Sequence, residues 1–158
     1  MGIDYGLRMS INEKKENVNE FINHVLNIIF PNETHSYNVS ESDFYIGITT
    51  DLYTLNIGKF NDVSRQFTLE DYGVDVNTSL SFRPYGETRV EGAREMIKLV
   101  FSLLKKYDGD CILLPNGDYA AILRHKGELF IDTSKGFFNN FDLSLIDIPY
   151  TDKVIDEI

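Results

Sequence analysis

The chain has 158 residues, of which 42% are hydrophobic and 25% are charged, a composition typical of a globular protein. Its formal net charge of −10 argues against a nucleic-acid partner, because phosphate binding needs a surplus of lysine and arginine on some face. A single cysteine excludes an internal disulfide, and the sequence shows neither a secretory signal nor an apolar run long enough to span a membrane. We therefore expect one cytoplasmic domain over residues 1–158, with no membrane association.

The first part of the chain predicts a strand followed by a helix. Residues 3–9, IDYGLRM, alternate apolar and polar side chains, as in a strand that is buried on one face. Ser10 and Glu13 then have the spacing of a capping box, and apolar residues recur at three- and four-residue intervals as far as Pro31. This pattern predicts an amphipathic helix that opens at Ser10 and is stopped by Pro31.

Three strand-like segments follow, in residues 43–50, 53–60 and 73–85, and all are rich in β-branched and aromatic side chains. The third segment has the clearest alternation, and five of its residues are expected on one face: Val74, Val76, Thr78, Leu80 and Phe82. Residues 61–73 show no comparable period, and we interpret them as a loop or a short irregular strand.

A second helix is predicted from Thr88 to Lys106. Thr88 and Glu91 have the spacing of another capping box, and an apolar stripe continues to the end of the segment. Lysines in the last turn, at positions 105 and 106, suit the negative end of the helix dipole.

The remaining sequence predicts three short strands and then a tail of 22 residues, 137–158, to which we assign no regular structure. The strands are CILL, YAAILR and ELFID, in residues 111–114, 119–124 and 128–132. The last two are joined by a tight turn in which Gly127 supplies the positive φ. The order β-α-β-β-β-α-β-β-β, with two helices and a mostly antiparallel sheet, predicts an α+β fold.

Residues 108–134 bring together the residue types of a cysteine-nucleophile enzyme, including Cys111 and His125. A catalytic thiolate needs a lowered pKa, usually from a helix N-terminus or an adjacent protonated histidine. Cys111 instead follows the C-terminal end of a predicted helix, where the dipole raises a thiol pKa, and His125 lies at the tip of the predicted hairpin. We interpret Cys111 as a buried structural residue.

Other chemical motifs are missing from the sequence. The three histidines are scattered without metal-ligand spacing, and no glycine-rich phosphate-binding motif occurs, so we expect neither a metal nor a cofactor. Residues 69–71, LED, could act with Asp75 as acid and base. A small enzyme that uses such carboxylates, or Cys111, is therefore the alternative to a binding protein.

A chain that is well patterned but poor in reactive groups is typical of a protein that works by binding. Two acidic segments, residues 36–45 and 65–75, combine aromatic side chains with carboxylates, as interface hot spots do. The contacts predicted for a protein partner are Glu41, Asp43, Tyr45, Glu70, Asp71, Tyr72 and Asp75.

Three stretches carry a resemblance to a known family: IDYGLRM at the start, SLSFRP before the second helix, and GDCILLPNGDYAAILRHKGELFI in residues 109–131. Their arrangement resembles that of the small cytosolic immunity proteins of bacterial polymorphic toxin systems, particularly those paired with lipoprotein toxins exchanged between neighbouring cells. The resemblance implies a non-enzymatic protein that binds a cognate toxin and blocks it, without assigning the contact residues. Many such toxins are basic nucleases, which an acidic inhibitor would bind quickly by charge complementarity. A general interaction domain with no toxin link is a further alternative.

Overall fold

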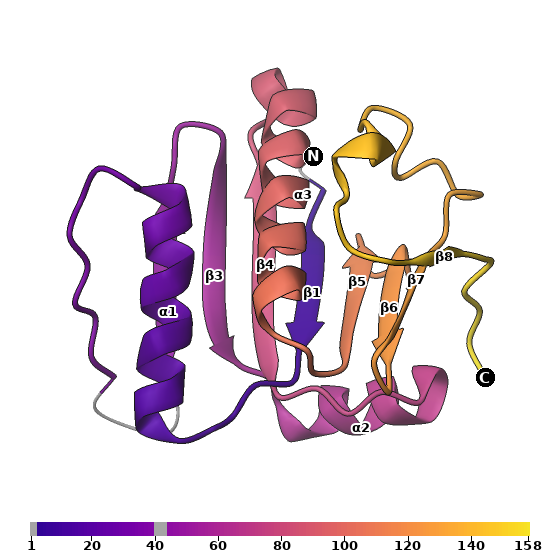
Figure 1. Cartoon of the computed structure of the whole chain (residues 1–158), viewed down its shortest axis with the longest axis horizontal. Coiled ribbons are helices and arrows are strands. Elements are labelled where there is room, and N and C mark those ends of the chain that lie inside the picture. The colour runs from indigo at the N-terminus through magenta and orange to yellow at the C-terminus, as the bar shows by residue number, and fades with distance from the viewer. Residues whose placement is uncertain (1–2, 40–43) are drawn as a thin grey trace.

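The first strand of the chain lies near the middle of one eight-stranded sheet, whose strand order is β2-β3-β4-β1-β5-β6-β7-β8 (Figure 1). The computed structural model describes residues 3–39 and 44–158. The strands in these residues are β1 (Tyr5–Met9), β2 (Tyr45–Thr49), β3 (Tyr53–Lys59), β4 (Thr78–Pro84), β5 (Cys111–Pro115), β6 (Ile122–His125), β7 (Glu128–Ile131) and β8 (Thr151–Asp152). The helices are α1 (Lys15–Ile29), α2 (Asp62–Tyr72) and α3 (Arg89–Lys106), with 3-10 turns at Gly86–Thr88 and Leu143–Leu145. All strand pairs are antiparallel except β7 with β8, so the predicted α+β fold is confirmed.

The main core lies between the sheet and the helices α1 and α3, which cover the same face (Figure 1). Leu80, Leu7 and Leu113 are register partners on β4, β1 and β5, and all three are fully buried. Each such side chain contributes about 1.5–3 kcal/mol when it is removed from water. The predicted strand at the start of the chain is thereby confirmed, because its alternate residues face this core.

A smaller apolar cluster packs on the opposite face, over β5 to β7. Its buried members are Phe60, Val74, Val76, Ile112, Ala120 and Ile155. This corrects the prediction that Val74 and Val76 share a strand face with Leu80 and Phe82, which belong to the main core. The two valines precede β4, in a segment that leaves α2 through the left-handed Gly73 (φ 76°) and crosses the back of the sheet.

The prediction of a loop or irregular strand in residues 61–73 is wrong, because this segment forms α2. Asn61 caps the helix by accepting a hydrogen bond from the Ser64 backbone N–H (2.8 Å), and Gly73 closes it by donating its backbone N–H to Leu69 O (2.9 Å). Thr68 alone is buried along α2, so the sequence has no apolar stripe that would indicate a helix.

The helix limits are partly as predicted. α1 ends at Ile29, ahead of Pro31, and α3 covers the expected range, but neither capping box forms. Ser10 lies five residues before α1, where its backbone N–H pairs with Asp110 O (2.9 Å), and the Thr88 side chain makes no cap hydrogen bond. The hairpin between β6 and β7 is confirmed, since Lys126 and Gly127 both have positive φ.

The C-terminal segment returns to the sheet, although most of its residues are exposed. β8 pairs in parallel with β7, and the backbone N–H of Ile158 donates to Asp71 O at the end of α2 (2.7 Å). Within residues 3–39 and 44–158, none of the helices combines the length and apolarity that crossing a membrane requires.

Candidate functional site

Cys111 is fully buried on β5, where it faces the main core. Burial raises the pKa of its thiol to about 12, and the nearby Arg124 offsets only part of that effect. A thiol with this pKa is almost entirely protonated at neutral pH, and it is inaccessible to a substrate. The interpretation of Cys111 as a structural residue is therefore supported by its environment.

His125 and Asp110 form a contact at the hairpin, with 3.5 Å between His125 Nδ1 and Asp110 Oδ2. The other carboxylate oxygen of Asp110 accepts a hydrogen bond from the Lys126 backbone N–H (3.1 Å) and so supports the turn. In strand register Cys111 is opposite Arg124, not His125, so the thiol and the imidazole leave the sheet on different faces. Among the described residues, no group of three or more His, Cys, Asp and Glu side chains could hold a metal ion.

The helix α2 exposes large apolar side chains that are unusual on a charged surface. Val63 is 67% exposed and Phe67 is 58% exposed, and the two lie one turn apart on the helix. Leu69 is also exposed, but it lies two residues after Phe67 and therefore on a different side of the helix. Two large apolar side chains exposed side by side among polar residues are a typical mark of an interaction surface.

Carboxylates surround the C-terminal end of this helix. Glu70 and Asp71 lie on α2 itself, and Asp156 and Glu157 come from the C-terminal segment, which is tied to Asp71 by the Ile158 hydrogen bond. Burial raises the pKa of the Tyr72 hydroxyl, and the nearby charges of Glu157, Asp71 and Asp156 raise it further. We call this surface the α2 face, defined by Val63, Phe67, Glu70 and Asp71, with Asp156 and Glu157 beside the C-terminal end of the helix.

Arg65 also lies on α2, and its charge is already paired. Arg65 donates from Nε and from a terminal nitrogen to the two oxygens of Asp75 (2.6 and 3.1 Å), and it lies 3.8 Å from Glu13. These hydrogen bonds lower the pKa of the Asp75 carboxyl, which stays ionised. The α2 face consequently presents net negative charge around an apolar centre.

The structure groups some of the predicted partner contacts and separates others. Glu70 and Asp71 lie on the α2 face, whereas Tyr72 packs partly buried against the smaller apolar cluster and Asp75 is held by Arg65. Tyr45 is 73% exposed on the edge strand β2, opposite Gly58 and thus at the end of the sheet from which α2 departs. Two predicted contacts, Glu41 and Asp43, lie outside the described residues.

Val63 and Phe67, the most exposed apolar residues of α2, were not among the predicted contacts. Their signal in the sequence is an i, i+4 pair of large apolar side chains, but that spacing acquires meaning only once residues 62–72 are known to be helical.

A model of the SitI3-like family matches residues 3–142 of the chain. The matched range includes all three helices, α2 among them, while Asp156 and Glu157 lie beyond it. No curated protein and no solved structure matches the chain.

Proposed function

The chain belongs to the SitI3-like family, and from this membership we propose that it is a non-enzymatic immunity protein that binds a cognate toxin domain and blocks it. The name of the family and the sequence resemblance to immunity proteins of polymorphic toxin systems point to the same role. Such a protein acts in the cytoplasm of the cell that it protects, a reducing compartment that suits its single buried thiol.

The observation that carries the binding part of the proposal is the exposure of Phe67 and Val63 next to the carboxylates of Glu70 and Asp71, one turn further along α2. Burying each of these side chains against a partner would contribute about 1.5–3 kcal/mol. The surrounding acids would add little affinity at the rim, but they would speed the approach of a basic toxin and disfavour acidic partners. We assign the α2 face as the principal contact surface, with Tyr45 at its margin.

An enzyme that uses carboxylates is less well supported. A general acid at neutral pH needs a raised pKa, whereas the pKa of Asp75 is lowered by Arg65. Residues 69–71 lie in the last turns of α2, where Leu69 and Glu70 are exposed and Asp71 is half-buried. The proposal therefore treats these acids as binding groups.

Co-expression with the toxin encoded by the adjacent gene tests the function. We expect the chain to co-purify with that toxin in a stoichiometric complex and to protect cells that produce it. A chain that neither captures nor protects against the neighbouring gene product is not an immunity protein for it, and a general interaction domain is then the better description.

Substitutions on α2 test the surface separately. Phe67→Ser should weaken toxin binding by about ten-fold or more, because interface anchors of this kind typically contribute over 1.4 kcal/mol. Leu145→Ser is the matched control, since Leu145 is 59% exposed but lies in the 3-10 turn far along the chain from α2. Wild-type protection combined with unchanged binding by Phe67→Ser would leave the function standing and move the contact surface elsewhere.

A further inference from the structure

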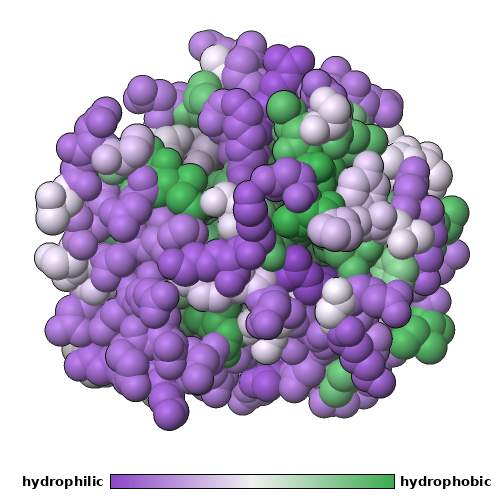
Figure 2. All heavy atoms as spheres, in the orientation of Figure 1, coloured by the Kyte–Doolittle hydropathy of each residue, from purple (hydrophilic) through white to green (hydrophobic). Residues whose placement is uncertain are grey.

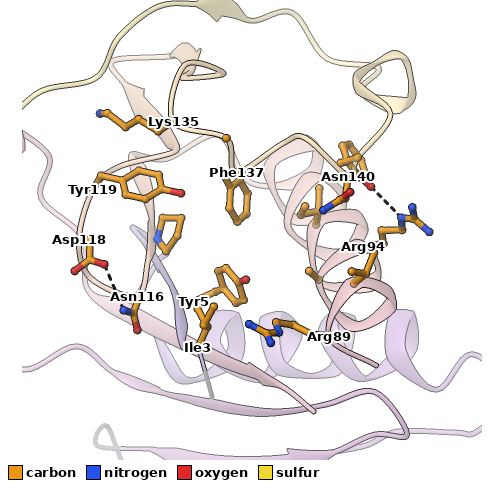
Figure 3. Close-up of a pocket in the computed structure, with 16 residues that line it drawn as sticks. Ile3, Tyr5, Arg89, Arg94, Asn116, Asp118, Tyr119, Lys135, Phe137 and Asn140 are labelled. Carbon is orange, nitrogen blue, oxygen red and sulfur yellow. Dashed lines mark hydrogen bonds between the residues drawn. The ribbon is translucent and has the colours of Figure 1, made fainter. Parts of the chain in front are cut away.

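A cavity of about 380 Å³ opens beside α3, at the end of the sheet opposite α2 (Figures 1 and 3). Its walls come from four separate parts of the chain: Tyr5 of β1, Arg89 of α3, Tyr119 between β5 and β6, and Phe137 after β7. Figure 2 shows hydrophobic residues at the surface between α3 and the C-terminal loops, on a face that is otherwise largely hydrophilic. The cavity is thus an apolar hollow in a hydrophilic surface.

The fold brings these side chains together for local reasons. Tyr5 is opposite Pro115 in the register of β1 and β5, so the start of β1 and the end of β5 share one edge of the cavity. The 3-10 turn after β4 leads directly into the first residue of α3, which is Arg89. Gly136 has a positive φ (83°) immediately before Phe137, whose ring lies 5.7 Å from that of Tyr5.

Three hydrogen-bond donors face this cavity without a protein partner. Figure 3 shows the Arg89 guanidinium and the hydroxyl groups of Tyr5 and Tyr119 directed toward its interior. None of these three groups makes a hydrogen bond or an ion pair with another side chain or carbonyl among the described residues. Burial raises the pKa of the Tyr5 hydroxyl and Arg89 opposes that shift, so the guanidinium and the hydroxyl are electrostatically coupled across the cavity.

The other charged residues that line the cavity are engaged elsewhere. Arg94 donates to the carbonyl oxygen of Asn140 (2.9 Å), and Lys135 pairs with Asp132 (3.0 Å). Asp118, the acid of the lining, accepts a hydrogen bond from Asn116 (3.3 Å) and is turned away from the interior (Figure 3). Arg89 is therefore a free cation at an aromatic cavity in a chain of net charge −10.

We propose that this cavity binds a small anion with a flat apolar body, of the class of aromatic carboxylates and aryl phosphates. The anionic group would pair with Arg89 and accept hydrogen bonds from the Tyr5 and Tyr119 hydroxyls. The ring of the ligand would pack against Phe137 and Pro115. Cavities of this size and lining, apolar with a few convergent polar groups, are the usual form of small-molecule sites.

A titration of the full, isotope-labelled chain with phenyl phosphate tests the site by NMR, with benzyl alcohol as the neutral ligand of similar shape. We expect phenyl phosphate to shift the backbone resonances of Arg89, Gly136 and Phe137, and benzyl alcohol to bind about ten-fold more weakly or worse, since a charge-assisted hydrogen bond to Arg89 is lost. Equal binding of the two ligands, or no shift of these resonances by phenyl phosphate at about 10 mM, would overturn the proposal.

Two variants test the role of the Arg89 charge. Arg89→Gln should weaken phenyl phosphate binding by about ten-fold, and because the Arg89 side chain is exposed, the fold should persist. Arg65→Gln removes the same charge at the far end of the sheet and should leave the affinity unchanged. Unaltered binding by Arg89→Gln would contradict the assignment. No toxin takes part in this titration, so its failure would not bear on the immunity function, and the reverse also holds.

Discussion

Asp132 is a fully buried carboxylate that holds the C-terminal segment against the sheet. Its Oδ1 accepts hydrogen bonds from the backbone N–H and the hydroxyl of Ser134 (2.9 and 2.5 Å). Its Oδ2 accepts from the backbone N–H of Ile155 (3.0 Å) and pairs with Lys135 (3.0 Å). Burial alone would raise the pKa of Asp132, but these hydrogen bonds outweigh it and hold the pKa well below its usual value. This one side chain therefore anchors the loop that lines the cavity and the segment that carries Asp156.

Asp132→Asn should destabilise the protein by about 1–3 kcal/mol at pH 7, because charge-assisted hydrogen bonds are lost in a buried site. The folded-state pKa lies below the unfolded value of about 3.9, so the contribution of the carboxylate is present above that value and is lost as the pH falls toward the folded pKa. Urea unfolding at about pH 7 and about pH 3 should accordingly show a gap between variant and wild type that narrows in acid.

Asp142→Asn is the matched control for this prediction. Asp142 accepts the same two hydrogen bonds from Ser144 (3.0 and 2.6 Å), but its side chain is exposed to solvent. We expect its substitution to leave the free energy of unfolding almost unchanged. A gap for Asp132→Asn that stays constant from neutral to acid pH would show that charge is not the source of its contribution.

At the scale of elements, Arg124 of β6 joins the sheet to the C-terminal end of α3. Its guanidinium is buried and donates to the carbonyl oxygens of Leu104 (2.7 Å) and Tyr107 (2.5 Å). The last carbonyl groups of a helix have no partner within the helix, so these two hydrogen bonds replace contacts that water would otherwise supply. The positive charge of the guanidinium also interacts favourably with the negative end of the α3 dipole.

Arg124→Met should lower the free energy of unfolding by about 2–4 kcal/mol, because two carbonyl groups lose their partners where water has little access. Arg83→Met is the control, since Arg83 forms an ion pair with Asp4 (2.7 Å) in which both side chains are largely exposed. Such an exposed pair contributes little to stability, because solvent screens it. Chemical denaturation measures the free energy of unfolding of both variants. Similar losses for the two would mean that the contact of Arg124 with α3 stabilises the fold no more than an exposed ion pair does.

The elements that could be predicted from the sequence are those that bury one regular stripe. α1 and α3 each repeat apolar residues at helical spacing, and the hairpin between β6 and β7 has its glycine at the turn. α2 has sound end signals in Asn61 and Gly73, but with Thr68 as its buried residue it lacks the period on which the prediction depended. β8 is two residues long and is fixed by parallel pairing with a distant strand, for which no local signal exists.

The sequence predicts less of the candidate sites than of the fold. The acids of the α2 face could be chosen from composition, but the apolar residues at its centre required the helix to be known. The cavity could not be predicted at all, because Tyr5, Arg89, Tyr119 and Phe137 are unremarkable in their own segments. They become a site only through the register of β1 with β5 and the position of α3.

At the scale of the whole molecule, the two proposed surfaces lie at opposite ends of the sheet and differ in charge (Figure 1). The α2 face has the carboxylates of Glu70 and Asp71 next to Phe67, whereas the cavity presents Arg89 within aromatic walls. If both proposals hold, a basic protein and a small anion would bind without competing for the same surface.

The acidity of the α2 face should control how fast the toxin binds, and Phe67 should control how long it stays bound. For a basic toxin, raising the salt concentration from about 0.05 M to about 0.5 M should slow association by about ten-fold or more, because the charges are screened beyond a few ångströms. Glu70→Lys should slow association about three- to ten-fold at low salt with little change in dissociation, whereas Phe67→Ser should mainly speed dissociation. Stopped-flow measurements of both rates separate the effects, and Glu87→Lys makes the same charge change in the exposed 3-10 turn that precedes α3, at the other end of the sheet. If Glu87→Lys slows association as much as Glu70→Lys does, the steering comes from the net charge of the whole molecule and not from the α2 face.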